Sequence, residues 1–150
     1  MEQLTTYRAK GKSIGLVFLF KYDLNGNLKL FEISEGQLTD SQIRWLFSAN
    51  FPANEFIMKT IWMKDKALRE KFEVETSPAD LSFEALWKLY DHKIAKFHAE
   101  KAFKKMKEEA VIKCFVSIPI YKKYLAFSKV GQAHLATFIN GQYYENEYKL

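Results

Sequence analysis

Residues 13–34 predict a β-hairpin, because their first half is an apolar segment rich in β-branched and aromatic residues and hydrophobic positions alternate along the return strand. Its two halves flank Asn25-Gly26, the dipeptide preferred in a type I′ turn because both central residues there need a positive φ. The positions that share one face at a spacing of two are Phe18, Phe20, Tyr22 and Leu24. We expect that face to form the core of a first module.

Helical spacing follows the hairpin. Residues 39–42 offer N-caps for a first helix, and Phe51-Pro52 ends it. A second helix is expected just after Pro52, and its predicted inward-facing residues are Phe56, Ile57, Met58, Ile61 and Trp62. Residues 71–76 alternate again and predict a third strand. The predicted order is β-β-α-α-β, a compact α+β module.

A polar, proline-containing segment marks a boundary, because the hydrophobic period changes there from two to about 3.6. We therefore predict an α+β module at residues 1–76, a linker at 77–82 and an all-helical module at 83–150. The predicted fold class is α+β, a hairpin-led module followed by a small helical one. No strand is expected in residues 83–127.

Two apolar stripes predict the main helices of the second module. The first stripe comprises Phe83, Leu86, Trp87, Tyr90, Ile94 and Phe97, with a break expected at 91–96. The second comprises Val111, Cys114, Phe115, Ile118, Tyr121 and Leu125, and Pro119 within it should kink or restart the helix. A last helix at 135–139 should be capped by Asn140-Gly141. The aromatic residues expected to be buried together are Trp87, Tyr90, Phe103, Phe115 and Phe138.

An ordered series of short motifs runs through the second half. They are Trp87-Lys88-Leu89-Tyr90, Lys93-Ile94-Ala95-Lys96, Ala99-Glu100-Lys101-Ala102-Phe103-Lys104-Lys105, Pro119-Ile120-Tyr121-Lys122-Lys123-Tyr124, His134-Leu135-Ala136-Thr137-Phe138-Ile139-Asn140 and Tyr143-Tyr144-Glu145-Asn146-Glu147. In order and spacing this series resembles the C-terminal helical region of bacteriophage and prophage replication proteins, over residues 83–147. The resemblance implies a phage or mobile-element context and a link to replication, and it supplies no catalytic residues.

The chain departs from that family in specific places. Leu135 stands where the family has a proline, and Phe103 and Phe138 replace two tryptophans. The first half does not read as the winged helix that larger members carry, so their DNA-binding domain cannot be transferred to this chain.

The formal net charge of +5 is unevenly distributed. Residues 1–80 hold 11 basic and 11 acidic side chains, whereas residues 81–150 hold 12 basic and 7 acidic ones. A basic half favours a polyanionic partner, because neutralising phosphates drives non-specific nucleic-acid affinity. Arginine is scarce, so we expect sequence-tolerant contacts to the backbone rather than readout of bases.

Lysines and tyrosines of the second half are the candidate nucleic-acid-binding residues. They are Lys93, Lys96, Lys101, Lys104, Lys105, Lys122, Lys123, Tyr143 and Tyr144. Lysines outside the apolar stripes suit phosphate contact, and paired tyrosines can stack on unpaired bases. Two alternatives stay open: the lysines form an ordinary solvated face, and the tyrosines pack back on the helices.

No motif for catalysis or for a cofactor is found, so we predict a non-enzymatic protein without a metal or cofactor. The single cysteine, Cys114, excludes an internal disulfide and a cysteine-based zinc site. His92 and His98 are six residues apart, on different helical faces, and His134 is placed to cap the last helix. No run is long enough to span a membrane, and the expected location is the bacterial host cytoplasm.

The sequence thus predicts a phage or mobile-element accessory protein linked to DNA replication. Its partner would be nucleic acid or a replication protein, and no membrane is expected to be involved. Two other hypotheses remain: an adaptor or inhibitor that binds a host protein, and a component packaged in virions.

Overall fold

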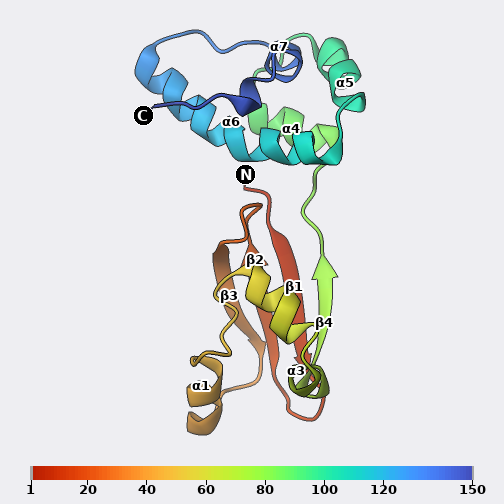
Figure 1. Ribbon diagram of the computed structural model, residues 1–150, viewed down its shortest axis with the longest axis vertical. Helices are drawn as coiled ribbons and strands as arrows, with labels where there is room; N and C mark the ends of the chain where they lie inside the picture. Colours follow the sequence, from red (N-terminus) through yellow and green to blue (C-terminus); the bar gives the residue numbers. More distant parts are fainter. Residues whose placement is uncertain (1, 150) are drawn as a thin grey trace. The chain divides into compact units, whose positions relative to one another are not determined.

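The computed structural model describes residues 2–149, and Figure 1 shows its helices and strands. The chain forms two compact units, one at Glu2–Ala79 and one that begins at Asp80. Their boundary falls inside the polar segment 77–82. The first unit contains an antiparallel sheet with helices and the second contains helices, so the predicted α+β class is confirmed.

The sheet has four strands in the order β3-β2-β1-β4. They are β1 (Thr5–Gly11), β2 (Val17–Tyr22), β3 (Leu28–Glu35) and β4 (Phe72–Ser77). β2 and β3 form the predicted hairpin, with Phe20 opposite Phe31. β1 pairs antiparallel with β2 on one side and with β4 on the other. The two edges of the sheet are therefore β3 and β4.

The predicted order was wrong in omitting β1, a central strand. Its buried side chains are Tyr7 and Ala9, and only one of them is large. The hydrophobic alternation is therefore weak where Thr5, Thr6, Arg8 and Lys10 separate these positions. β1 is held in place mainly by backbone pairing on both of its sides, a signal that a single sequence does not carry.

The hairpin turn also differs from the prediction. Gly26 has a φ of 82°, but Asn25 is not among the residues with positive φ, so the turn is not type I′. The Gly26 N–H donates to Asp23 O at 3.0 Å, and the Asp23 N–H donates to Asn27 O at 2.9 Å. The Asp23 carboxylate accepts from the N–H groups of Asn25 and Asn27. These bonds form a three-residue loop in which Gly26 supplies the left-handed position.

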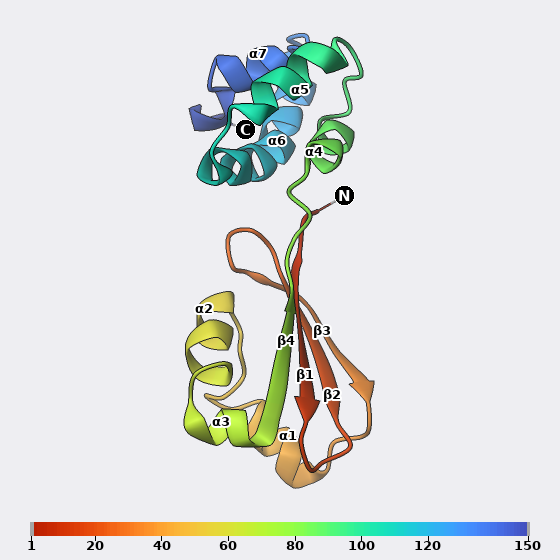
Figure 2. The same cartoon turned by 90° about the vertical axis from the view of Figure 1, so that its right-hand side faces the viewer.

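Short helices cover one face of the sheet (Figure 2). They are α1 (Asp40–Leu46), α2 (Glu55–Ile57), the π-helical turn η1 (Met58–Trp62) and α3 (Lys66–Lys71). Thr39 caps α1 in a reciprocal capping box with Gln42, which confirms the predicted helix start.

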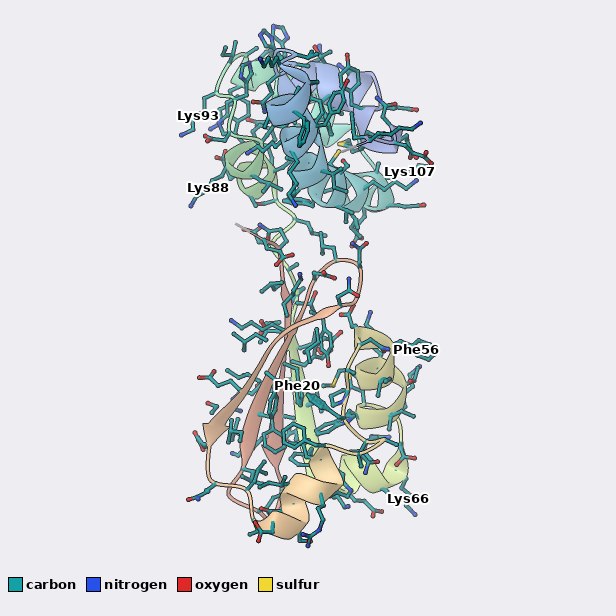
Figure 3. The ribbon with its side chains drawn as sticks, turned by 90° about the vertical axis from the view of Figure 1, so that its left-hand side faces the viewer. Phe20, Phe56, Lys66, Lys88, Lys93 and Lys107 are labelled. Atoms are coloured by element: carbon teal, nitrogen blue, oxygen red, sulfur yellow. The ribbon has the colours of Figure 1, made fainter. Side chains whose placement is uncertain are left out.

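Two residues predicted to face the core lie outside it. Phe56 is 73% exposed and Ile61 is 40% exposed, whereas Met58 and Trp62 are fully buried. Figure 3 shows Phe56 pointing away from the sheet and Phe20 pointing into the space under the helices. Phe56 precedes Met58 by two residues, which places it on the opposite side of a helix.

Aromatic rings fill the core of the sheet unit. The Trp62 ring lies 5.4 Å from that of Phe20 and 5.1 Å from that of Phe72, measured between centroids. The polar tips are satisfied: Trp62 Nε1 donates to Asn50 O at 2.7 Å, and Tyr22 Oη donates to Pro52 O at 2.6 Å. The predicted hydrophobic face of β2 is therefore confirmed as the core.

The second unit contains only helices among its described residues. They are α4 (Phe83–Tyr90), α5 (Lys96–Lys104), α6 (Glu108–Ser128), α7 (Leu135–Asn140) and the 3₁₀ turn η2 (Tyr143–Glu145). The predicted break appears as segment 91–95. Its first and last residues, Asp91 and Ala95, have left-handed φ values of 51° and 57°. α6 runs continuously through Pro119, so no restart occurs there.

Most of the predicted helical core is buried. Trp87, Tyr90, Phe115 and Phe138 are buried, whereas Phe103 is only half-buried. The ring contacts form two groups rather than one. Phe83 contacts Trp87 and Phe103, and a separate group joins Tyr90, Tyr121 and Phe138.

Two residues of the first predicted stripe are exposed instead. Ile94 is 50% exposed and Phe97 is 75% exposed, so their assignment to the core was wrong. The break at 91–95 ends α4 and starts α5 with a new phase. In that phase Ala99 and Ala102 face inward and Phe97 faces out.

Gly141 ends α7, but not through a left-handed conformation. Its φ is −84°, and a Cβ at this position would lie 2.9 Å from Thr137 O and 2.7 Å from Tyr143 Cε1. Glycine is needed here for close approach of the chain, and the left-handed φ of 53° falls on Gln142.

Candidate nucleic-acid interface

The positive charge of the helical unit is concentrated around α5. Residues 93–107 contain six lysines and a single acidic residue, Glu100. α5 occupies the centre of this segment, with Lys93 in the preceding loop and Lys107 at the start of α6. Figure 3 shows the side chains of Lys93 and Lys107 extending away from the unit. The formal charge of this segment, +5, equals that of the whole chain, so the positive and negative charges of all other residues cancel.

The outer face of α5 combines an aromatic ring with two lysines. Ala99 and Ala102 are buried on the inner face. Phe97, Lys101 and Lys104 follow at i, i+4 and i+7, which places them along one side of the helix, and all three are exposed. The Phe97 ring contacts the His98 ring edge-on at 5.7 Å, and most of its surface remains open to solvent. We call these three residues the outer face of α5.

Sequence reasoning missed Phe97 because it extended the stripe of α4 across the break. The signal was present, since the expected break at 91–96 implied a change of helical phase before Phe97. An exposed phenylalanine beside lysines is available to a partner, whereas a buried one is not. A flat apolar ring beside lysines is a combination of groups that can stack on unpaired bases and contact phosphate.

Only some of the predicted lysines form ion pairs among the described residues. Lys96 Nζ lies 3.3 Å from Glu84 Oε1, and Lys104 Nζ lies 3.6 Å from Glu100 Oε1. Both pairs are exposed to solvent and are therefore weak and easily exchanged for another anion. Among residues 2–149, no carboxylate oxygen lies within 4.0 Å of Lys93, Lys101 or Lys105.

A shallow hollow of about 290 Å³ lies at the corner between α5 and α6. Its polar lining residues are Lys105, Lys107, Asn140, Gln142 and Tyr144. The structure thus brings together two residues predicted separately, Lys105 and Tyr144. The amide side chains and Lys107 were not among the predicted site residues. We call this set the corner hollow.

Lys122 and Lys123 are placed differently from each other. Lys122 Nζ donates to the Leu89 carbonyl in the last turn of α4, and Gln132 Nε2 donates to Tyr90 O at 2.8 Å. These two side chains satisfy carbonyls at the end of α4 that have no partner within the helix. Lys123 is exposed on α6. The structure therefore gives Lys122 a helix-capping role.

The C-terminal tyrosines pack on the helices. The Tyr143 ring lies 5.9 Å from that of Phe138, and the Tyr144 ring lies 6.4 Å from it. Both side chains are half-buried, and burial raises the pKa of Tyr144. Tyr148 Oη donates to Tyr143 O at 3.0 Å and holds the last turn in place. Packing was one of the two alternatives left open by the sequence, and Tyr144 also lines the corner hollow.

The histidines and the cysteine form no reactive centre with one another. The rings of His92 and His134 lie 5.6 Å apart with a tilt of 34°, and His134 occupies the N-cap position of α7 without a side-chain cap bond. Burial raises the pKa of the Cys114 thiol to about 12, which keeps it protonated at neutral pH. Within the described residues, no three His, Cys, Asp or Glu side chains form a group that could hold a metal ion.

None of the helices within residues 2–149 has the length and apolar character needed to cross a membrane.

The helical unit is the part of the chain that resembles known proteins. Residues 78–142 match the family model described as Legionella vir region protein LvrA C-terminal domain. The match begins after β4 and ends at Gln142, so it includes α5 and every polar residue of the corner hollow except Tyr144, and none of the four strands. No curated protein and no solved structure matches the chain significantly. The chain is thus similar to that C-terminal domain over its helical unit.

Proposed function

We propose that this protein is a non-enzymatic accessory protein of a phage or other mobile element, and that it binds nucleic acid through its helical unit. The observation that carries the proposal is the outer face of α5, where the exposed Phe97 lies in line with Lys101 and Lys104. The proposed context of DNA replication in the bacterial cytoplasm rests on the resemblance of residues 83–147 to phage replication proteins.

The chemistry of this face suits an unpaired strand. Lysine ammonium groups contact phosphate as point charges and do not read base edges. An exposed aromatic ring stacks on a base of any identity, but only where the base is not already stacked in a duplex. We therefore expect sequence-tolerant binding, with single-stranded DNA bound more tightly than duplex.

The corner hollow extends the same surface beyond the end of α5. Lys105 is the C-cap of α5 and Lys107 is the N-cap of α6, so they follow Lys104 by one and three residues. A strand crossing the outer face would meet these cations next. The corner hollow is thus the proposed site of a neighbouring phosphate.

The decisive experiment is fluorescence anisotropy with single-stranded and duplex oligonucleotides over a salt series. Replacing Lys101, Lys104 and Lys105 together by Glu should weaken binding and flatten the plot of log affinity against log salt. Each lost phosphate contact should reduce the slope by about 0.7–0.9. The fold should remain stable, because these side chains are exposed and the substitutions lose only the weak Lys104–Glu100 pair and add weak repulsion between exposed carboxylates.

A matched control separates site from net charge. Lys12→Glu, Lys64→Glu and Lys66→Glu change the charge of the chain by the same amount, at exposed positions of the sheet unit. This control should lose much less affinity than the α5 variant. Equal losses, or no binding of either oligonucleotide at low salt, would overturn the proposal and leave the protein-binding hypothesis in its place.

A further inference from the structure

The sheet unit contains a cavity of about 380 Å³ that the proposed function does not use. It lies between the loop that joins β1 to β2, helix α1 and the start of β4. Its apolar walls are formed by Leu16, Phe18, Leu38, Trp45, Leu46 and Phe72. This volume falls in the range of about 300–1,000 Å³ that is typical of pockets for small ligands.

Hydrogen bonds fix the walls of this cavity before any ligand is present. The Gly11 N–H donates to Leu16 O at 2.8 Å, and the Lys12 N–H donates to Lys71 O at 2.9 Å, which anchors the loop to the sheet. The capping box between Thr39 and Gln42 fixes the start of α1. A preformed cavity loses little free energy to ordering when it binds a ligand.

One cation stands at this apolar cavity. Lys71 is the only charged residue among those that line it. Its Nζ lies 4.6 Å from the centre of the Trp45 ring, on one wall. Within residues 2–149, no carboxylate oxygen lies within 4.0 Å of this ammonium group. The cavity therefore offers apolar walls together with a positive charge that has no anionic partner.

We propose that this cavity binds the carboxyl-terminal residue of a partner protein, with a large apolar side chain against the walls and the α-carboxylate on Lys71. The Lys71 ammonium lies beside Trp45, which forms part of the apolar wall. A ligand that contacts both must therefore carry its apolar group and its anion close together. In a terminal residue both groups are attached to the same Cα atom, which satisfies that requirement directly. A charge-assisted bond from the ammonium to the carboxylate supplies the discrimination.

The test compares two peptides that differ only at the carboxyl end. N-acetyl-Gly-Gly-Phe with a free carboxylate is titrated against its C-terminal amide, and a third peptide, N-acetyl-Gly-Phe-Asp-amide, places the carboxylate on a neighbouring side chain. Fluorine NMR of protein containing 5-fluorotryptophan reports binding at Trp45, and Trp87 in the helical unit serves as an internal control. The free acid should shift the Trp45 signal in a saturable way and bind roughly tenfold more tightly than the amide.

Variants of Lys71 assign the preference to its charge. Lys71→Met keeps an apolar stem beside Trp45 and should reduce binding of the acid to the level of the amide, whereas Lys71→Arg should retain the preference. Lys66→Met, at an exposed lysine outside the cavity, should leave it unchanged.

Three results would overturn the proposal, and each can be read in the unmodified protein. The first is equal affinity for the free-acid peptide and its amide. The second is no change in the fluorine signal of Trp45 with any of the peptides. The third is binding of the internal aspartate peptide as tight as that of the free acid, which would contradict recognition of a chain terminus. No nucleic acid is used, so failure here is independent of the function proposed for the helical unit.

Discussion

The two units place their charges and their aromatic residues in opposite ways. The sheet unit balances its charges and buries large rings whose polar tips have partners, as for Trp62 and Tyr22. The helical unit collects its excess of lysines along α5 and leaves Phe97 exposed among them. Exposed phenylalanines also occur at Phe56 and Phe127, so α5 is distinguished by the number of lysines around its exposed ring rather than by the ring alone.

The largest effect should come from the core of the sheet unit. Trp62→Ala should reduce the free energy of unfolding by about 3–5 kcal/mol, since Trp62 is fully buried and its Nε1–H satisfies Asn50 O. Trp87→Ala should cost less, because Trp87 is slightly less buried, at 8% exposed, and the solvent-exposed Lys96 ammonium lies 6.0 Å from its ring centre. Chemical denaturation followed by circular dichroism measures both. A larger loss for Trp87→Ala would reverse the comparison.

The next effect distinguishes two adjacent lysines of α6. Lys122→Ala should cost about 1.5–3 kcal/mol, because it removes a charged donor from the Leu89 carbonyl at the end of α4. Lys123→Ala should change stability by less than about 0.5 kcal/mol, because its side chain is exposed. Thermal melts of the two variants test this directly. Equal losses would show that Lys122 is not a structural cap.

A pH-dependent effect should arise from the buried thiol of the helical unit. The folded state raises the pKa of Cys114 from 9.0 to about 12 through burial, so the thiol stabilises the fold below pH 9 relative to higher pH. That contribution is lost progressively between about pH 9 and 12, because the unfolded chain releases the proton first.

The measurement is the difference in stability between the unmodified protein and Cys114→Ala across this range. At pH 10 the unmodified protein should have lost about 1.4 kcal/mol more than the variant. Parallel pH profiles for the two proteins would mean that the thiolate is tolerated in the fold. The thiol should also resist labelling by a disulfide reagent at neutral pH until the unit unfolds.

The smallest effect on stability should occur at Phe97. Phe97→Ala should leave the melting temperature nearly unchanged, since the ring is 75% exposed. Its effect on binding should be larger, a loss of about 1–3 kcal/mol in affinity for single-stranded DNA. Anisotropy and thermal melts of the same variant separate the two readouts. A destabilised variant would mean that Phe97 contributes to folding after all.

Much of the fold was predictable where side chains carry a strong periodic signal. The β2–β3 hairpin, the start of α1 at Thr39, and the break between α4 and α5 all follow from local pattern and capping chemistry. β1 was missed because its place in the sheet depends on pairing with residues far along the chain. Phe56 and Phe97 were misplaced for a shared reason. Helical phase restarts after each break, and an apolar residue near a break fits either phase on sequence alone.

The site was predictable in composition but not in geometry. Five of the six lysines of residues 93–107 were identified as site residues from sequence. Their division into paired and unpaired side chains required the positions of Glu84 and Glu100, and the capping role of Lys122 required that of the Leu89 carbonyl. The cavity beside Lys71 was not anticipated, because its walls come from three separate segments that only the folded sheet brings together.

The pairing of β1 with β4 bears on how the sheet unit folds. Arg8 of β1 lies opposite Glu75 of β4. One edge of β1 therefore stays unpaired during folding until β4 has joined the sheet. A contact between residues so distant in sequence raises the contact order and slows folding of the unit. Until β4 arrives, β1 presents an open edge to other chains, a state that favours aggregation. Low temperature and low protein concentration during refolding should therefore benefit the sheet unit more than the helical one.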